Sequence, residues 1–105
     1  MHVEGWHTYY VYILTNRNKT VLYTGLTNNL SRRLMEHKEN IQLIKKTFAA
    51  KYKCKHLLYY EKYTWVHDAI TREKEIKGWI RAKKLELIKT TNPNMSFLEG
   101  EFLFK

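Results

Sequence analysis

The sequence predicts a single α/β (α+β) domain, in which a small three-stranded antiparallel sheet packs against helices. Three observations support this fold class. The chain has 105 residues, a length that suits one hydrophobic core. Its residues are 44% hydrophobic and 14% aromatic, which is enough apolar side chain to build that core. Aromatic and β-branched runs occur near the start and again near residue 57, while helical patterns occupy much of the remainder.

The first two strands are expected to form a hairpin. Residues 8–14, TYYVYIL, are rich in aromatic and β-branched side chains, and a polar cluster separates them from VLYTG at residues 21–25. A four-residue loop over residues 16–19 would pair Thr15 with Thr20. The same register would place Tyr23 opposite Tyr12, although this pairing depends on the turn.

A helix is expected to follow the hairpin. Gly25 ends the second strand, and the residues TNN offer N-caps for a helix from about residue 30 to residue 38. Residues 41–53 are ambiguous and allow a short helix followed by a loop. The run HLLYYE, residues 56–61, then predicts the third strand.

The last third of the chain is predominantly helical. The pattern runs from residue 64 to about residue 91, with Gly78 as the break between two helices, and Asn92-Pro93 ends it. The tail NMSFLEGEFLF carries enough apolar residues to pack back on the body. The expected order is strand, strand, helix, an optional short helix, strand, helix, helix.

Charge and cysteine content narrow the function classes. Lys and Arg number 19 against 10 Asp and Glu, so the net charge is +9. Such an excess favours an anionic partner, nucleic acid before an anionic membrane, although a basic and inert surface is the alternative. The single cysteine, Cys54, excludes an internal disulfide and is expected to be a buried, unreactive thiol. No stretch resembles a membrane span or a signal peptide, so a soluble cytoplasmic protein is expected.

Two adjacent arginines on the first helix point in different directions. Leu30 and Leu34 define the buried stripe. At 100° per residue, Arg33 and His37 lie within about 60° of Leu30, whereas Arg32 points to solvent. Arg33 therefore lies against the sheet, where a guanidinium needs a partner or a function. An arginine whose stem packs on the core while its head reaches water is the alternative.

A carboxylate interrupts the apolar stripe of the next helical region. Glu73 lies in the middle of that stripe, while Glu75 projects to the opposite side. The apolar members of the stripe are Val66, Ala69, Ile70, Ile76 and Ile80. A buried carboxylate is costly unless a cation compensates it. Glu73 is therefore either part of an ion pair, for instance with Arg33, or a metal ligand or general base.

The hairpin tyrosines complete a possible site. Tyr10 and Tyr12 share one face of their strand, and cross-strand aromatic packing with Tyr23 would explain them without any chemistry. If their phenols converge with the polar groups of the helices, however, the cleft holds a phosphate-handling set. It would contain a cation for an oxyanion, a ligand for a hard metal and a group able to move a proton.

These motifs resemble those of the GIY-YIG nuclease superfamily. Tyr10-Val11-Tyr12 and Tyr23-Thr24-Gly25 match the two halves of its name motif with the family's spacing. The family's arginine, histidine, glutamate and asparagine match Arg33, His37, Glu73 and Asn92. The resemblance covers about residues 8–98 of the 1–105 domain. It is closest to small stand-alone members that are similar to the N-terminal domain of the excision-repair incision subunit.

Three positions depart from the family pattern. Tyr10 stands at the first glycine of the name motif, and Val11 and Thr24 stand at its isoleucines. None of these is a chemical residue of the family. The loss of the glycine is expected to alter backbone access beside the scissile phosphate.

The resemblance implies a metal-dependent endonuclease that hydrolyses phosphodiester bonds in DNA, with a possible role in DNA repair or recombination. Glu73 would hold one Mg²⁺ (or Mn²⁺) ion, and Arg33 would stabilise charge on the phosphorane. Tyr12 would take the proton of the attacking water, with Tyr23 assisting and His37 as a further catalytic residue. Because a free phenol has a pKa of about 10, Tyr12 needs positive charge nearby. No small-molecule cofactor is expected.

Further basic and polar side chains are expected to contact the nucleic acid. They are Arg32, Lys77, Arg81, Lys83, Lys84 and Asn92. The basic run Lys74, Lys77, Arg81, Lys83 and Lys84 could track a phosphate backbone, but a solvated helix face explains it at least as well. Two other readings stay open: a catalytically weak or inactive nucleic-acid-binding module of the same fold, and a structural domain that recruits a protein partner. The sequence leaves the oligomeric state open.

Overall fold

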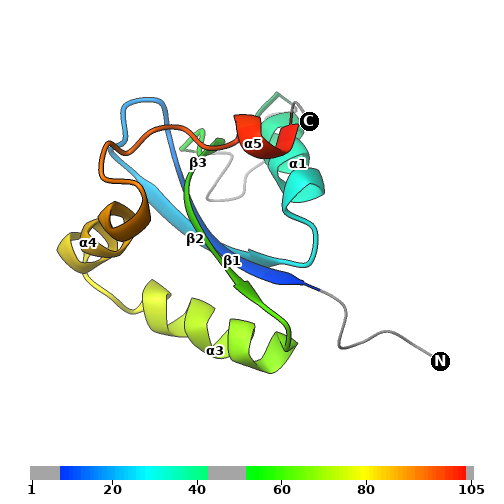
Figure 1. Ribbon diagram of the computed structural model, residues 1–105. Coiled ribbons are helices and arrows are strands. Elements are labelled where there is room, and N and C mark those ends of the chain that lie inside the picture. Colours follow the sequence, from blue (N-terminus) through cyan, green and yellow to red (C-terminus); the bar gives the residue numbers. More distant parts are fainter. Residues whose placement is uncertain (1–7, 43–51, 104–105) are drawn as a thin grey trace.

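A three-stranded antiparallel sheet lies between helices in the computed structural model, which describes residues 8–42 and 52–103 (Figure 1). The strands are β1 (Tyr9–Thr15), β2 (Leu22–Thr27) and β3 (His56–Tyr63). Their order is β2-β1-β3, with β1 antiparallel to both neighbours. The α+β fold class expected from the sequence is thereby confirmed.

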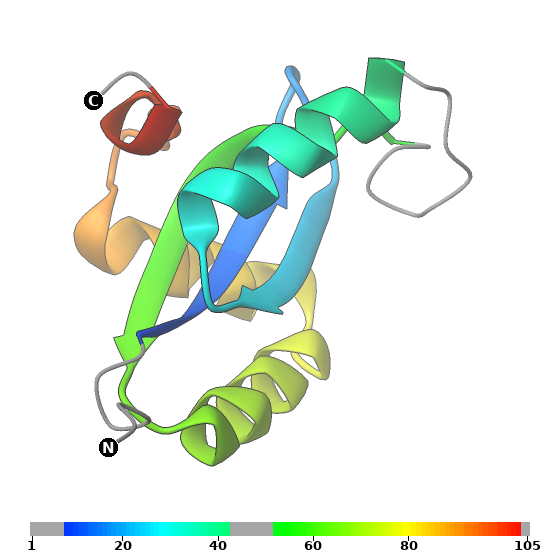
Figure 2. The same ribbon diagram turned by 90° about the vertical axis from the view of Figure 1, so that its right-hand side faces the viewer.

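Helices cover both faces of the sheet. They are α1 (Leu30–Gln42), α3 (Val66–Lys77), α4 (Arg81–Thr91) and the short α5 (Gly100–Leu103). Turning the molecule by 90° shows α1 in front of the sheet and α4 behind it (Figure 2). The predicted break at Gly78 is present, and the helical region ends before Asn92 as expected. Most of the ambiguous segment 41–53 lies outside the described residues.

The central strand β1 supplies two cores because its side chains alternate between the two faces of the sheet. Val11 and Ile13 pack with Ala69, Ile76 and other apolar side chains on the side of α3 and α4. On the other side, one cluster holds Tyr12 and Leu14 of β1, Leu30 and Leu34 of α1, Cys54 and Leu57. The tail packs back on this second cluster through Leu98 and Phe102, as predicted.

The predicted hairpin register is wrong by two residues. Thr15 pairs with Leu22, and Gly25, rather than Tyr23, lies opposite Tyr12. The loop is longer than the predicted four residues because the side chain of Asn16 hydrogen-bonds backbone N–H groups in the second half of the loop. Its Oδ1 accepts from the N–H of Thr20 at 2.8 Å and from that of Val21 at 3.2 Å. Since the shift is even, Tyr12 and Tyr23 still face the same side of the sheet.

The predicted apolar stripe of α3 is correct only in the middle. Ala69 and Ile76 are fully buried, but Val66 is 44% exposed and Ile80 is 73% exposed. Val66 is the first residue of α3, and Ile80 follows the break at Gly78, where the helical angle no longer applies. None of the helices described by the structure combines the length and the apolar character needed to cross a membrane.

Candidate active site

The position of the Tyr12 ring depends on the absence of a side chain at Gly25. A Cβ atom added to Gly25 would lie 2.4 Å from both Cζ and the hydroxyl oxygen of Tyr12. The ring therefore lies directly over the backbone of β2, the edge strand of the sheet. Gly25, the last residue of the second half of the name motif, thus allows the Tyr12 phenol to reach across β2 toward the sheet edge.

Helix α1 brings two polar groups to the Tyr12 hydroxyl. Asn29 caps this helix, because its Oδ1 accepts from the N–H of Arg32 at 3.0 Å. Farther along, Nε2 of the buried His37 lies 3.1 Å from the Tyr12 hydroxyl. The guanidinium of Arg33 also hydrogen-bonds Tyr12 and donates to Glu36 at 3.0 Å. The expected inward direction of Arg33 and His37 is confirmed.

Burial controls the protonation of this pair. It raises the pKa of Tyr12 to about 12, and the hydrogen bond from Arg33 opposes the rise without cancelling it. Burial, together with the positive charge of Arg33, lowers the pKa of His37 to about 4. At neutral pH the ligand-free protein therefore holds a protonated phenol beside a neutral imidazole. His37 is able to accept the Tyr12 proton when its own proton is on Nδ1.

Tyr23 packs beside the same pair. Its ring centroid is 5.4 Å from that of His37 and 6.4 Å from that of Tyr12. The cross-strand pairing with Tyr12 is absent, but the two rings are diagonal neighbours on one face. The structure therefore brings Tyr12, Tyr23, Arg33 and His37 into one cluster, as the sequence predicted.

Glu73 approaches this cluster from α3. Its negative charge contributes to the raised pKa of Tyr12, so the two groups are within electrostatic range. The Glu73 side chain is 14% exposed, and its Oε2 pairs with Nζ of Lys77 at 2.6 Å. The suggested ion pair with Arg33 is therefore wrong, since Arg33 pairs with Glu36 instead. Glu75 is 53% exposed and points outward, as expected.

The side chains near Tyr12 suit one hard cation that takes only part of its coordination from the protein. Among the described residues, no group of three or more His, Cys, Asp or Glu side chains could enclose a metal. Glu73 offers a carboxylate whose charge contributes to the raised pKa of Tyr12, and Lys77, 53% exposed, can leave it without being buried. Mg²⁺ commonly takes one or two carboxylates and fills its other positions with water and phosphate oxygens. The residues present therefore fit such an ion.

A polar network on β3 holds α3 in place, and the sequence reading missed it. The Glu61 carboxylate accepts from Nε of Arg72 at 2.9 Å and from Nη2 at 3.0 Å. It also accepts from the hydroxyls of Tyr59 and Tyr63. Because Arg72 directly precedes Glu73, this network fixes the register in which α3 presents Glu73. The alternation of Tyr59, Glu61 and Tyr63 on one strand face was the available signal.

The residues expected to contact nucleic acid are spread over several surfaces. Arg32 is exposed and bonds Asn28 and Glu36. Lys83 lies over the Trp79 ring at 4.3 Å. The guanidinium of Arg81 donates to the carbonyls of Lys19 and Thr20 in the hairpin loop. Lys77 pairs with Glu73, and Lys84 is half-buried on α4. Their contacts with nucleic acid stay predictions.

Asn92 has a structural role in this fold, and its expected contact with nucleic acid stays a prediction. It is 6% exposed, and its amide nitrogen donates to the carbonyls of Leu58 at 3.0 Å and Ser96 at 2.9 Å. Its Oδ1 accepts from the N–H of Ser96 at 3.0 Å. This amide ties the end of α4 to β3 and to the tail, so its hydrogen-bonding groups are already used.

Comparisons with known proteins found a family model and relatives that match most of this chain. The family model of the GIY-YIG catalytic domain matches residues 8–86. A UPF0213 protein of Syntrophus aciditrophicus is 38% identical over 90 residues, covering 82% of this chain and 95% of that protein. A UPF0213 protein of Pediococcus acidilactici is 38% identical over 89 residues, covering 85% and 89%.

One solved structure supports the fold. The solution NMR structure of a UPF0213 protein from Bacillus halodurans superposes with a TM-score of 0.53 at 24% sequence identity. The match covers 83% of this chain and 88% of that one. At this identity the likeness concerns the fold alone.

Proposed function

Because this chain belongs to the GIY-YIG family of nucleases, we propose that it is a metal-dependent endonuclease that hydrolyses phosphodiester bonds in DNA. Its UPF0213 relatives place it among the small stand-alone members of that family. The observation that carries the proposal is the setting of the Tyr12 hydroxyl. It lies between His37 and Arg33, and Glu73 is within electrostatic range of it.

Arg33 would bind the phosphate. Its side chain is 34% exposed, so the guanidinium reaches solvent while it contacts Tyr12. Its only ion-pair partner among the described residues, Glu36, is 44% exposed and can be displaced at little cost. A guanidinium placed there stabilises the extra negative charge that a phosphodiester gains in the transition state.

Tyr12 and His37 would move the proton of the attacking water. A phenol with a pKa of about 12 is a poor base by itself at neutral pH. His37, however, lies within hydrogen-bonding distance and is neutral. Tyr12 can therefore accept the water proton on its oxygen while its own proton passes to Nε2 of His37. The negative charge of a bound phosphate would raise the pKa of His37 and so favour this transfer.

Glu73 would hold the Mg²⁺ or Mn²⁺ ion. When bound, such an ion polarises phosphate oxygens and neutralises charge on the leaving group. Glu73 would exchange its contact with Lys77 for the metal, and the freed ammonium would remain near the phosphates. A role in DNA repair or recombination, which the resemblance implies, is part of this proposal.

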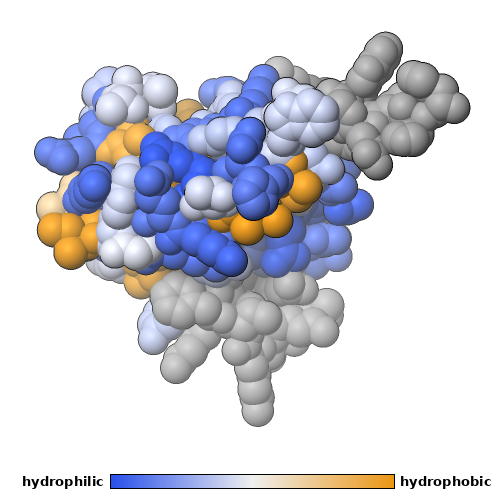
Figure 3. Space-filling model, turned by 90° about the horizontal axis from the view of Figure 1, so that it is seen from below, coloured by the Kyte–Doolittle hydropathy of each residue, from blue (hydrophilic) through white to orange (hydrophobic). Residues whose placement is uncertain are grey.

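Two competing readings concern activity and partner. The raised pKa of Tyr12 and the ion pair that occupies Glu73 favour a module that binds nucleic acid without cutting it. A protein-recruiting domain stays open, because the basic residues expected to bind nucleic acid are spread over several surfaces. Seen from below, the surface is largely hydrophilic, and its hydrophobic patches lie apart from one another (Figure 3).

One experiment separates these readings. The protein is incubated with supercoiled plasmid, branched DNA and single-stranded DNA in Mg²⁺, in Mn²⁺ and with chelator. The proposal predicts nicking that needs metal and is lost in Tyr12→Phe. Binding without nicking by the wild type, in either metal, would support the inactive module. Absence of both would leave the protein-recruiting domain.

A further inference from the structure

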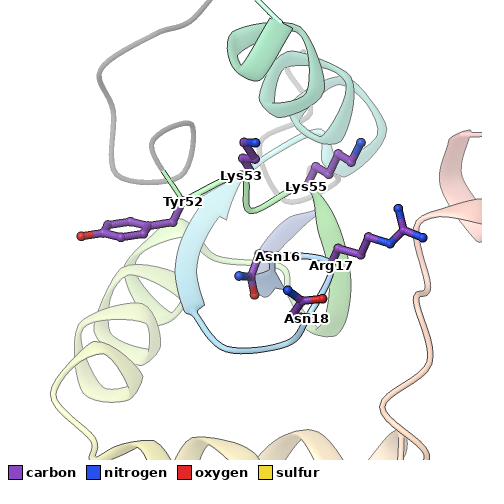
Figure 4. A pocket seen from close by; sticks show the side chains of 6 residues that line it. All are labelled: Asn16, Arg17, Asn18, Tyr52, Lys53 and Lys55. Carbon is purple, nitrogen blue, oxygen red and sulfur yellow. The ribbon is translucent and has the colours of Figure 1, made fainter.

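A basic pocket lies at the tip of the β1–β2 hairpin, away from the Tyr12 cluster. Its walls are the hairpin loop and the turn before β3, and its volume is about 330 Å³ (Figure 4). The lining residues are Asn16, Arg17, Asn18, Tyr52, Lys53 and Lys55. Lys53 and Lys55 stand on one rim, and the hairpin residues stand on the other.

Three cations of this pocket lack a compensating partner among the residues the structure describes. Arg17, Lys53 and Lys55 are exposed, and none forms an ion pair or a side-chain hydrogen bond with any residue the structure describes. Two of the basic side chains expected from sequence differ in this respect. Lys77 is paired with Glu73, and Arg81 is bound to the hairpin carbonyls. Three like charges around one hollow repel one another, and an anion placed between them relieves that repulsion.

The loop that carries Arg17 is held in place before any ligand arrives. Asn16 holds its second half through the amides of Thr20 and Val21, as described above. From α4, Arg81 donates to the carbonyl of Lys19 at 2.8 Å and to that of Thr20 at 3.0 Å. A pocket that is already ordered loses less entropy when it binds.

The pocket lies on a path that leads to the candidate active site. Asn16 follows Tyr12 by four residues along β1, and four residues of a strand span about 13 Å. Cys54, in the turn between Lys53 and Lys55, belongs to the same packed cluster as Tyr12. The turn is therefore on the same side of the sheet. A strand of a few nucleotides can therefore bridge the pocket and the candidate active site.

From this charge, order and position, we propose that the hairpin pocket binds the phosphodiester backbone of one nucleic-acid strand, a few nucleotides from the bond that is cut. The distance to the cut rests on the proposed function, whereas the binding does not. The strand can come from a duplex or from an unpaired segment, since both present the same backbone.

Salt-dependent binding tests the proposal directly. Affinity for a labelled 20-mer of thymidylate and for a mixed-sequence 20-base-pair duplex is measured from 50 to 300 mM salt. The variant Arg17→Gln/Lys53→Gln/Lys55→Gln removes the three charges. Each lost phosphate contact lowers the slope of log affinity against log salt by about 0.7 for a single strand and about 0.9 for a duplex. The triple variant should therefore lose about 2 units of slope if a single strand occupies the pocket, or about 2.7 units if a duplex does.

A matched control removes charge elsewhere. Lys62→Gln/Lys89→Gln changes two exposed lysines of β3 and α4 that do not line the pocket. This variant should keep the wild-type slope within a few tenths. Melting temperatures of all variants confirm that each one is folded. Equal slope loss per charge in both variants would show general attraction and overturn the proposal, as would an unchanged slope in the triple variant on both probes.

Two further arms separate this site from a free-anion site and from the proposed function. If inorganic phosphate binds the wild type but not the triple variant, while both keep the same strand slope, the pocket holds only small anions and the proposal fails. Nicking of plasmid is scored separately. If the triple variant loses slope but the wild type never nicks plasmid, the pocket proposal stands and the nuclease proposal fails. If the wild type nicks plasmid but the triple variant keeps its slope, the nuclease proposal stands and the pocket proposal fails.

Discussion

Gly25→Ala should inactivate the protein by displacing Tyr12, although Gly25 has no reactive group. The added Cβ would lie 2.4 Å from Cζ of Tyr12, where ordinary contacts begin at 3.4 Å. The ring must therefore retreat by about 1 Å, which breaks the 3.1 Å contact between its hydroxyl and His37. A displacement of this size in a catalytic group costs about 100-fold in rate. Overpacking should lower the free energy of unfolding by about 1–3 kcal/mol.

The assays are single-turnover nicking and urea denaturation, with Gly78→Ala as the matched control. A Cβ at Gly78 would meet nothing closer than the Glu75 carbonyl at 3.5 Å, and its φ of −79° suits alanine. That variant should keep its rate and gain up to about 1 kcal/mol of stability. In a Tyr12→Phe background, Gly25→Ala should cost little further turnover. A Gly25→Ala protein with wild-type rate and stability would refute the reasoning about Tyr12.

Three other variants test separate parts of the site. Arg33→Ala should abolish nicking, while Arg32→Ala should only weaken DNA binding, because of the two arginines only Arg33 contacts Tyr12. Equal loss of turnover in both variants would contradict this. Burial lowers the pKa of His37 to about 4, so the imidazole is neutral when folded and charged when unfolded as pH falls from 6.5 to 4. Urea titrations should show a loss of up to about 3 kcal/mol over that range in the wild type but not in His37→Gln. The hydroxyl of Thr24 is buried without a hydrogen-bond partner among the described residues. Thr24→Val should therefore raise the free energy of unfolding, measured by urea denaturation, by about 1 kcal/mol. A lower free energy of unfolding would show that the hydroxyl has a partner.

The direction of side chains on α1 was predictable from sequence because a regular helix rotates by a constant angle. Leu30, Leu34, Arg33 and His37 all point where 100° steps place them, and Cys54 is buried as expected. Burial raises the pKa of that thiol to about 11, which agrees with an unreactive cysteine.

The hairpin register and the partner of Glu73 were not predictable by the same reasoning. The register depends on the Asn16 side chain, whose Oδ1 accepts hydrogen bonds from the backbone N–H groups of Thr20 and Val21. A four-residue loop would have left these two groups for pairing between the strands. The role of Gly25 depends in turn on that register, since a shift of two residues brings it opposite Tyr12. Glu73 found its cation on its own helix, in Lys77, rather than across the sheet in Arg33. Such choices depend on tertiary distances that periodicity does not contain.

Cleavage by Glu73→Gln, beside its melting temperature and DNA affinity, tests the central claim most directly. The salt bridge with Lys77, which is 53% exposed, contributes at most about 1 kcal/mol, so the amide should fold and bind DNA almost normally. It lacks the charge that a hard cation requires. The account predicts that the wild type nicks plasmid in Mg²⁺ and stops with chelator, while Glu73→Gln binds the same DNA and does not cut it. A Glu73→Gln protein that nicks at the wild-type rate would contradict the account.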